Sequence, residues 1–274
     1  LSFWINAFGD LKIDVIRPID IETPLSGLAV KNPHTGKPTA KKTLKSYMQI
    51  LNSVFEFAID NRIIDYNPAA RVELPTAKPA TQRRALTAEE QRRILEFEHR
   101  GKPAMMLLML SGLRRGEATA LTWQDIDFDN STISVTKSFD FKQRKIKAPK
   151  NGKARTVFVP ALLIDYLKTL PHNSVFVLTS ARGTMMTEMA WKRLLESYLY
   201  DMNLEYGAFT VPQKKFAPQK VPFVIRPFTL HCLRHTFCSM MYNAGVDVLT
   251  AQQQMGHIDV KTTLEIYTHL SQEK

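Results

Sequence analysis

Apolar residues recur at intervals of three and four between residues 39 and 61, where the chain reads TAKKTLKSYMQILNSVFEFAIDN. Leu44, Met48, Leu51 and Phe55 all belong to this series. Residues with this spacing lie on one face of a helix, where they can pack against a core. The pattern therefore predicts a long amphipathic helix in the first part of the chain.

The periodicity stops between residues 75 and 86, PTAKPATQRRAL, where two prolines, small polar residues and an arginine pair occur together. This composition is typical of a linker. We therefore expect an all-helical first domain at 1–76, a linker at 77–86 and a second domain at 87–274. Thr87 and Glu90 have the spacing of a capping box, which predicts that a helix begins at once after the linker.

Strict alternation of β-branched and other residues marks two short segments, STISV at 131–135 and ARTVFV at 154–159. They predict an antiparallel hairpin. The intervening stretch, residues 137–155, holds eight Lys or Arg and one Asp. Such a charged turn is either solvated or relieved of its repulsion by phosphates. Residues 205–228 carry four prolines and no clear period, and so predict an irregular or β-rich insertion.

Helical periodicity returns in the last part of the chain, where turn residues divide it into three helices. The first begins at His231 and ends at Gly245, Asp247 caps the second, Gly256 ends it, and Asp259 caps the third. Because the connections are short, these helices must pack against one another. Taken together, the patterns predict a mainly α protein with a small β-sheet.

Composition narrows the class of partner. The 274 residues are 44% hydrophobic, which is enough for real cores, and 37 basic against 26 acidic residues give a net charge of +11 spread along the chain. A bias of this size suits a polyanion, with nucleic acid favoured over membrane. The longest apolar run, AMMLLML at 104–110, is too short to span a bilayer, and no signal peptide opens the chain. The two cysteines, Cys232 and Cys238, fit small buried side chains in a reducing compartment.

Candidate catalytic side chains stand in separate parts of the second domain. In SGLRRGEATALTWQDI, Arg114 lies between a glycine turn and a predicted helix that carries Glu117, Leu121 and Trp123. In HCLRHTF, His231 and Arg234 are three residues apart and would share one helix face. These positions give a core helix an unusual content of charged and titratable groups.

Two further candidates follow: His257 comes directly after the Gly256 break, and Tyr267 comes ten residues later. Two arginines, two histidines and a tyrosine without an evident metal cage suit phosphoryl transfer, which depends on positioning and on neutralising oxygen charge. Arginine binds phosphate at two points and stays charged. A tyrosine nucleophile would form a covalent phosphotyrosine, and nearby cations or a base would have to lower its pKa from about 10.

The ordered motifs GLRRGE at 112–117, a hairpin lysine, HCLRH at 231–235, MGH at 255–257 and IY at 266–267 resemble those of the tyrosine recombinase (phage integrase) family. Integrases of phages and conjugative transposons are the most similar members. The resemblance implies a helical core-binding domain and a mixed α+β catalytic domain that close as a clamp around DNA. It also implies no metal or nucleotide cofactor, and a homo-tetramer on double-stranded DNA from element ends and target. The resemblance further implies accessory proteins that bend the DNA and no association with a membrane. It also implies a location in the bacterial cytoplasm, at the nucleoid.

The resemblance assigns roles to the candidate residues. Arg114 and Arg234 would clamp the scissile phosphate. His231 and His257 would hydrogen-bond this phosphate or handle protons. Tyr267 would attack it to give a 3′-phosphotyrosyl link.

Three supporting roles are also implied. Lys150, in APKNGKART, matches the lysine that protonates the 5′-oxygen, with Lys147 and Lys153 as alternatives. Glu117 matches an acidic residue that supports the site. His235 is expected to pack or hydrogen-bond beneath it.

The chain departs from the family in a few places. Cys232 stands where the family often has Asp, so one supporting hydrogen bond is not expected. Seven residues follow Tyr267, where relatives often continue into a tail that docks on a neighbouring protomer. The first residue is Leu, so we expect a fragment or trimmed form in which any amino-terminal arm-binding domain is missing. His231 and His235 have the i, i+4 spacing of a zinc pair, but no Glu stands between them and no third ligand is evident.

Further DNA contacts are expected from basic side chains outside the catalytic motifs, at Lys41, Lys42, Lys45, Arg83, Arg84, Lys142, Arg144, Lys145 and Lys147. A solvated position is favoured for Lys41, Lys42 and Lys45 and is an equal alternative for the hairpin residues, whereas Arg83 and Arg84 in the linker could cross the duplex. Phosphate contacts of this kind give affinity and salt dependence and do not select a sequence.

The predicted function is that of a DNA site-specific recombinase that integrates or excises a mobile element. A type IB topoisomerase is an alternative, since it uses similar phosphotyrosine chemistry to relax supercoils. A non-catalytic DNA-binding relative is another, but it should lack at least one motif, and here every motif is filled. A metal-dependent nuclease would require divalent ions.

Overall fold

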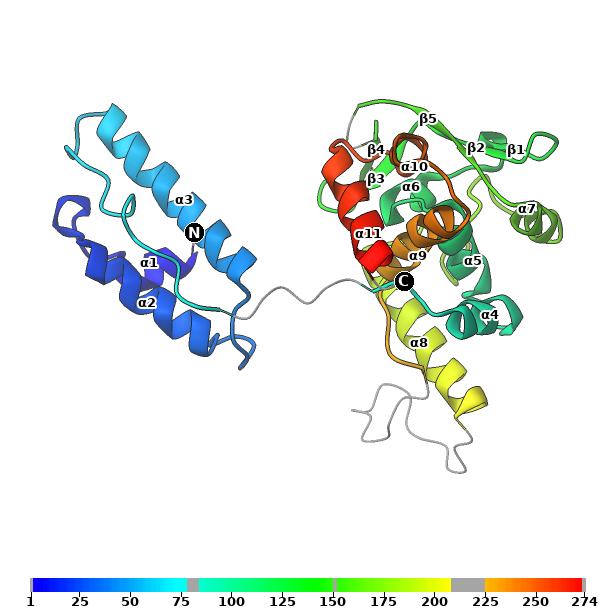
Figure 1. Cartoon of the computed structure of the whole chain (residues 1–274), viewed down its shortest axis with the longest axis horizontal. Coiled ribbons are helices and arrows are strands. Elements are labelled where there is room, and N and C mark those ends of the chain that lie inside the picture. The colour runs from blue at the N-terminus through cyan, green and yellow to red at the C-terminus, as the bar shows by residue number, and fades with distance from the viewer. Residues whose placement is uncertain (1, 78–83, 150–151, 208–224, 273–274) are drawn as a thin grey trace. The chain divides into compact units, whose positions relative to one another are not determined.

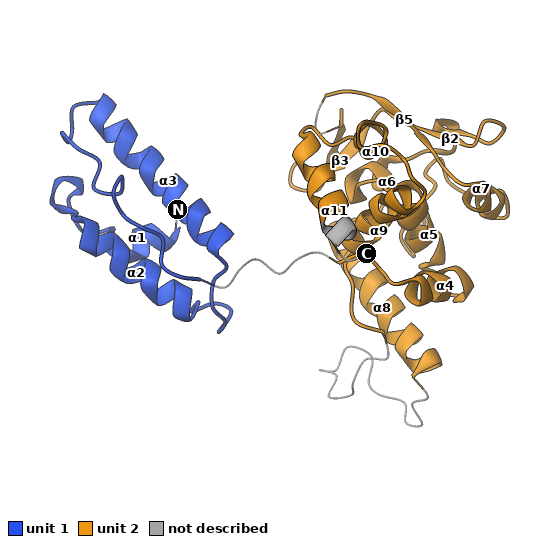
Figure 2. Cartoon of the chain, in the orientation of Figure 1, with its two compact units in different colours: residues 1–82 blue, residues 83–274 orange. Residues whose placement is uncertain are grey.

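The computed structural model describes residues 2–77, 84–149, 152–207 and 225–272, with side chains up to residue 268. The chain forms two compact units, residues 1–82 and 83–274, which Figure 2 colours separately. The boundary between them falls inside the segment 77–86 that the sequence predicts as a linker.

The first unit is helical in its described residues. Its elements are α1 (Ser2–Phe8), the 3-10 turn η1 (Ile13–Val15), α2 (Pro18–Val30) and α3 (Lys41–Asp60) (Figure 1). The long helix predicted at 39–61 is confirmed as α3, and its buried Leu44 and Leu51 pack with Leu25 of α2. Trp4 joins this core, and its Nε1 donates a hydrogen bond to the carbonyl of Tyr47 at 2.9 Å.

The second unit begins at the predicted capping box. The backbone N–H of Glu90 donates to Thr87 Oγ1 at 3.2 Å, and the N–H of Thr87 donates to Glu90 Oε2 at 2.9 Å. The helices that follow are α4 (Ala88–Glu96), α5 (Lys102–Ser111), α6 (Arg115–Ala120), α7 (Ala161–Lys168), α8 (Glu188–Tyr206), α9 (Leu230–Asn243), α10 (Val248–Met255) and α11 (Val260–Gln272). The helix predicted to carry Trp123 ends earlier, because Trp123 belongs to a separate 3-10 turn, η2 (Trp123–Asp125).

The predicted hairpin is confirmed as part of a three-stranded antiparallel sheet of order β1-β2-β5. Its strands are β1 (Ile126–Asp127), β2 (Thr132–Val135) and β5 (Arg155–Phe158), with Ile133 opposite Val157. The charged connection is more than a solvated turn, since β3 (Ser138–Asp140) and β4 (Lys145–Lys147) pair as a second hairpin. Asp140 organises this hairpin by accepting the backbone N–H of Lys142 at 2.9 Å and Lys147 Nζ at 2.6 Å.

The apolar run 104–110 lies at the centre of the second unit. It forms α5, which is buried on every side, as expected for a helix that is apolar all round. Helices α4, α6, α7 and α9 pack against it (Figure 1). Trp191 of α8 is also buried, and its Nε1 donates to Thr119 Oγ1 of α6 at 2.8 Å.

The last three helices, α9, α10 and α11, are separated at the turn and capping residues that the sequence predicts. Asp247 caps α10 by accepting the N–H groups of Leu249 and Thr250 at 3.0 Å, and Gly256 ends α10 in the left-handed conformation, with φ at 61°. The predicted insertion at 205–228 lies mostly outside the described residues, which resume at 225. No helix in the described ranges is long and apolar enough to cross a membrane.

Candidate active site

Three arginines from different elements bind three successive carbonyl groups at the carboxyl end of α10. These contacts join Arg155 Nε to Gln254 O at 3.0 Å, Arg234 Nη2 to Met255 O, and Arg114 Nη2 to Gly256 O at 2.6 Å. The last carbonyls of a helix lack amide partners and carry partial negative charge, so they attract guanidinium groups. The end of α10 therefore gathers three positive charges, which we call the arginine cluster.

A glycine turn brings Arg114 into this cluster. Gly112 ends α5 with φ at 62°, and a Cβ there would lie 2.3 Å from the ring of Phe237. Because this backbone and this close contact both exclude other side chains, the chain reverses at Gly112 and places Arg114 at the start of α6. There the N–H of Arg114 donates to Glu117 Oε2 at 2.8 Å, and its Nη1 donates to Oε1 at 2.9 Å.

Glu117 is the acidic partner of the cluster and is 2% exposed. Besides Arg114, it accepts two hydrogen bonds from Arg155, at 3.0 and 2.8 Å. Burial alone would raise the pKa of Glu117, but the hydrogen bonds and charge of Arg155, followed by those of Arg114, lower it to about 2. Glu117 is therefore ionised at neutral pH and orients both arginines.

Arg155 was not among the residues singled out from the sequence, although a signal was present. Alternation along β5 places Arg155 on the same side of the strand as Val157, which is fully buried. A basic residue on the inward face of a strand needs an acidic partner. The Arg155 side chain is 9% exposed and finds that partner in Glu117.

Arg234 is the most deeply buried arginine of the cluster, with 3% exposure. Its Nη1 donates to the carbonyl of Gly112 and its Nη2 to that of Met255, so it ties the end of α5 to the end of α10. Burial, helped by the charge of Arg114, lowers the pKa of Arg234 to about 9, which still leaves it protonated at neutral pH. A guanidinium has five N–H donors, so further donors remain for an anion.

The two predicted histidines lie near the cluster. His257 is half-buried, and its Nδ1 lies 2.8 Å from Thr263 Oγ1. Burial lowers the pKa of His257 to about 3, and the charges of Arg234, Arg114 and His231 act in the same direction. His257 is therefore neutral, while His231 sits exposed near the start of α9. The structure thus brings both histidines, Arg114, Arg234 and Glu117 into one site.

Tyr267 occupies a different position. Its hydroxyl donates to the carbonyl of Val246 at 3.1 Å, in the turn between α9 and α10, and its ring packs edge-on against Tyr242. Burial raises the pKa of Tyr267 to about 12, with added effects of Cys238 and Asp247. Within the described chain, none of the arginines contributes to this shift. The phenol is therefore held protonated at the α9–α10 turn.

The remaining predicted residues fall into four groups. Lys150 and Arg83 lie outside the described residues. Arg84 pairs with Glu90 at 2.5 and 2.8 Å and also donates to the carbonyl of Arg226 at 2.7 Å, so it is engaged within the second unit. His235 is half-buried on α9. The exposed candidates for DNA contact are Lys41, Lys42, Lys45, Lys142, Arg144, Lys145 and, although it pairs with Asp140, Lys147.

The cysteines and the described histidines give no sign of another chemistry. Cys232 and Cys238 are buried, and burial raises the pKa of Cys238 to about 11, which makes it a poor nucleophile. Among the residues that the structure describes, no three His, Cys, Asp or Glu side chains are grouped as a metal site requires.

Comparison with known proteins places these features in a wider group. A model of the phage integrase family matches residues 84–274. A tyrosine recombinase XerC-like protein of Caldanaerobacter subterraneus subsp. tengcongensis is 28% identical, over 95% of this chain and 69% of that protein. Tyrosine recombinase XerA of Thermococcus onnurineus is also 28% identical, over 85% of this chain and 73% of that protein.

Solved structures share the fold. The Tn1549 transposon integrase in complex with transposon right end DNA matches with a TM-score of 0.75 at 20% identity, covering 97% of this chain and 86% of that chain. A lambda integrase dimer bound to a COC′ core site matches with a TM-score of 0.68 at 18% identity, covering 97% and 68%. The mainly helical architecture with small sheets, predicted from the sequence, is confirmed as the fold of these integrases.

Proposed function

Because this chain belongs to the phage integrase family of tyrosine recombinases, we propose that the arginine cluster holds a scissile DNA phosphate and that Tyr267 attacks it. The chain is a DNA site-specific recombinase, an enzyme that breaks and rejoins DNA strands. The observation that carries the assignment of residues is the convergence of Arg114 and Arg234 on the end of α10, beside the buried, ionised Glu117.

The cluster supplies the electrostatics of the reaction. Arg114 and Arg234 keep N–H donors beyond those bound to carbonyls, and these donors would bind the non-bridging oxygens of the phosphate. Their position is fixed before DNA arrives, which is the condition for strong transition-state stabilisation. The Nδ1 of His257 faces Thr263, so its Nε2 is the nitrogen available to a phosphate.

The chemical step replaces one phosphate ester bond with another, so the number of these bonds stays constant. The Oη of Tyr267 attacks phosphorus, a P–Oη bond forms and the bond from phosphorus to the 5′-oxygen breaks. His231 takes the phenolic proton, because the lowered pKa of His257 makes His257 the poorer base and suits it to hydrogen-bonding the phosphate. The leaving 5′-oxygen receives a proton from Lys150. A 5′-hydroxyl of another strand then attacks the 3′-phosphotyrosyl bond and releases Tyr267. Since each bond replaces another, the exchange needs no external energy source.

Tyr267 must leave its present contact before it attacks. Its hydroxyl is bound to Val246, and its pKa of about 12 disfavours the nucleophilic phenolate. Moving α11 so that the phenol reaches the arginine cluster would exchange an apolar setting for a cationic one, which lowers a phenol pKa. DNA binding is the event that would drive this movement, because it delivers the phosphate that the tyrosine must meet.

DNA is the partner, and the wider assembly belongs to the same proposal. The first unit would act as the core DNA-binding domain, with exposed Lys41, Lys42 and Lys45 at the start of α3 directed to phosphates. The two units would clamp one duplex, and four protomers would join two duplexes. Accessory proteins that bend the DNA, and a location in the bacterial cytoplasm at the nucleoid, complete the proposed setting.

Recombination between two DNA molecules tests the function. One plasmid carries the joined element ends, another carries a target site, and new junctions are detected by amplification across them, with chelator present. Wild type should form junctions and Tyr267→Phe should form none. Relaxation of a supercoiled plasmid without junctions would instead favour a type IB topoisomerase. Dependence on divalent ions would favour a nuclease, and binding without either reaction would favour a non-catalytic DNA-binding protein.

A further inference from the structure

A buried hydroxyl group holds the imidazole of His257. The ring Nδ1 lies 2.8 Å from Oγ1 of Thr263, which belongs to the next helix, α11. Thr263 has 0% exposure, and it shares the inward face of α11 with Ile266 and Tyr267, which follow three and four residues later and are also buried. The helix that carries the proposed nucleophile therefore also contacts a proposed ligand of the phosphate.

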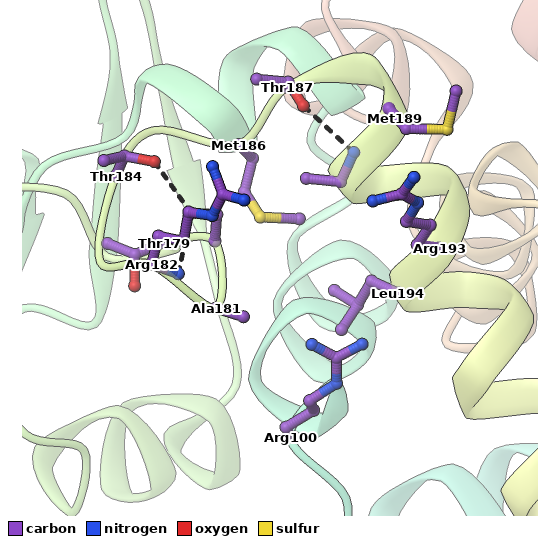
Figure 3. A pocket seen from close by; sticks show the side chains of 12 residues that line it. Arg100, Thr179, Ala181, Arg182, Thr184, Met186, Thr187, Met189, Arg193 and Leu194 are labelled. Carbon is purple, nitrogen blue, oxygen red and sulfur yellow. Dashed lines mark hydrogen bonds between the residues drawn. The ribbon is translucent and has the colours of Figure 1, made fainter.

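Other threonine hydroxyls of the second unit bind the backbone instead. Thr187, which Figure 3 shows beside the pocket at the start of α8, caps that helix by accepting the N–H of Ala190 at 3.1 Å. Thr119 lies inside α6 and donates to the carbonyl of Arg115, four residues earlier, at 2.8 Å. Within the described ranges, the hydroxyl of Thr263 makes neither kind of backbone bond, and its hydrogen bond goes to the imidazole. Thr263 thus serves a titratable ring.

The burial of Thr263 decides which of the two groups donates. A hydroxyl carries one hydrogen, and a neutral imidazole carries one N–H, either on Nδ1 or on Nε2. If the imidazole proton were on Nδ1, it would point at Thr263 Oγ1, and the buried hydroxyl hydrogen would have no acceptor among the described residues, which is costly. If the proton is on Nε2, the hydroxyl donates to Nδ1 and both groups are satisfied. The contact therefore favours the Nε2–H form of His257.

The Nε2–H form is the one that can bind a phosphate. The non-bridging oxygens of a phosphodiester accept hydrogen bonds and do not donate them, so a neutral histidine binds one only through a nitrogen that carries a proton. We propose that Thr263 is a positioning residue that donates to Nδ1 of His257 and thereby keeps the imidazole proton on Nε2, which donates it to the scissile phosphate. This inference rests on the proposed function and adds a residue from outside the motifs of the sequence.

The contact is compatible with the movement that Tyr267 requires. Thr263 lies in the first turn of α11, and Asp259 fixes this turn by accepting the N–H of Lys261 at 2.9 Å. Tyr267 lies one helical turn later. A swing of α11 about its first turn would carry Tyr267 toward the arginine cluster and leave the bond between Thr263 and His257 in place.

The position of the imidazole proton is measured by nitrogen NMR of the DNA-free protein, isotope-labelled at its histidines. The spectra distinguish Nε2–H from Nδ1–H, and His257→Gln identifies the signals of His257. Wild type should show the Nε2–H form. Thr263→Val removes the hydroxyl at nearly the same shape and should allow the Nδ1–H form to appear, whereas Thr263→Ser should keep the wild-type pattern. Wild type in the Nδ1–H form, or an unchanged pattern in Thr263→Val, would overturn the proposal.

Cleavage rates show whether the contact serves the reaction. On a nicked element-end duplex at saturating protein, Thr263→Val should form the covalent product more slowly by about tenfold or more, a loss of the size seen when the partner that orients a metal-binding histidine is removed. Thr263→Ser should recover most of the rate. The control Thr262→Val, on the exposed side of the same turn, should match wild type.

A double variant separates this role from a packing role. In a His257→Gln background, Thr263→Val should cause no further loss of rate, because Thr263 acts through the imidazole. An unchanged rate in Thr263→Val alone, or equal losses in the two backgrounds, would contradict the proposal.

A failure of the proposed function would look different. If wild type captured no DNA, the roles of Tyr267 and the arginine cluster would be wrong, whereas the position of the imidazole proton in the DNA-free protein would still test the contact between Thr263 and His257.

Discussion

Arg155 joins two parts of the site that no short-range pattern connects. It neutralises Glu117 and binds the carbonyl of Gln254, so one side chain links β5 to α6 and α10. Removing one partner of a buried ion pair leaves an uncompensated charge. Its loss should therefore affect stability and the orientation of Arg114 together.

The first prediction concerns Arg155→Ala and Arg155→Lys. The alanine variant should lower the free energy of unfolding by about 3–5 kcal/mol, measured by urea denaturation. The lysine variant should lose less stability because it keeps the charge, but it cannot bind Glu117 at two points. Under conditions where it is folded, it should cleave a nicked duplex more slowly with unchanged DNA affinity. An alanine variant within about 0.5 kcal/mol of wild type would contradict this role.

His257 should make stability depend on pH. Burial and nearby cations lower its pKa from 6.5 to about 3, so the unfolded chain binds this proton more tightly than the folded chain. Unfolding free energy should therefore fall as pH drops below 6.5, with no contribution above it. Glu117 acts in the same direction, but below its ordinary pKa of 4.5. Urea unfolding between pH 7 and 5 should show a shallower decline in His257→Gln than in wild type; parallel curves would contradict this assignment.

At the scale of elements, the end of α10 is the feature on which the site depends. Gly256 and Gly245 both adopt positive φ, at 61° and 76°. A Cβ at Gly245 would meet open space, whereas a Cβ at Gly256 would lie 2.9 Å from the guanidinium of Arg155. The two positions therefore separate backbone strain from disruption of the arginine cluster.

Gly245→Ala should cost about 1–2 kcal/mol, the penalty of left-handed backbone for an L-residue. Gly256→Ala should cost more in the same urea assay and should also slow cleavage, because Arg155 must move and the Gly256 carbonyl binds Arg114. Equal losses of stability in the two variants, with cleavage preserved, would show that the close contact with Arg155 has no consequence.

The elements that local chemistry defines were predictable from the sequence. The spacing of Leu44 and Leu51 predicts α3, and Thr87 with Glu90 predicts the start of α4. The hairpin β3–β4 was missed because its pairing depends on a carboxylate turn at Asp140 inside a highly charged stretch. The contacts of the arginines with α10 were also missed, since backbone carbonyls at a helix end have no signature in side-chain patterns.

At the scale of the whole molecule, two units with separate cores divide the chain. The predicted catalytic residues span Arg114 to Tyr267, and the fold of the second unit brings most of the described ones together. The position of the Tyr267 hydroxyl was not predictable from the sequence. The IY motif indicates a nucleophile but not where its side chain lies, and the hydrogen bond to Val246 depends on how α11 packs. The structure thus holds the hydroxyl of the proposed nucleophile at the Val246 carbonyl, outside the contacts of the arginine cluster.

Covalent trapping tests the central claim most directly. Duplexes that carry candidate element ends and a nick beside the cleavage point are incubated with wild type and Tyr267→Phe in the presence of chelator, and resolved on a denaturing gel. Wild type should give a protein band shifted by attached DNA, and Tyr267→Phe should give none while still binding the duplex. A shifted band that persists in Tyr267→Phe would show that another residue is the nucleophile.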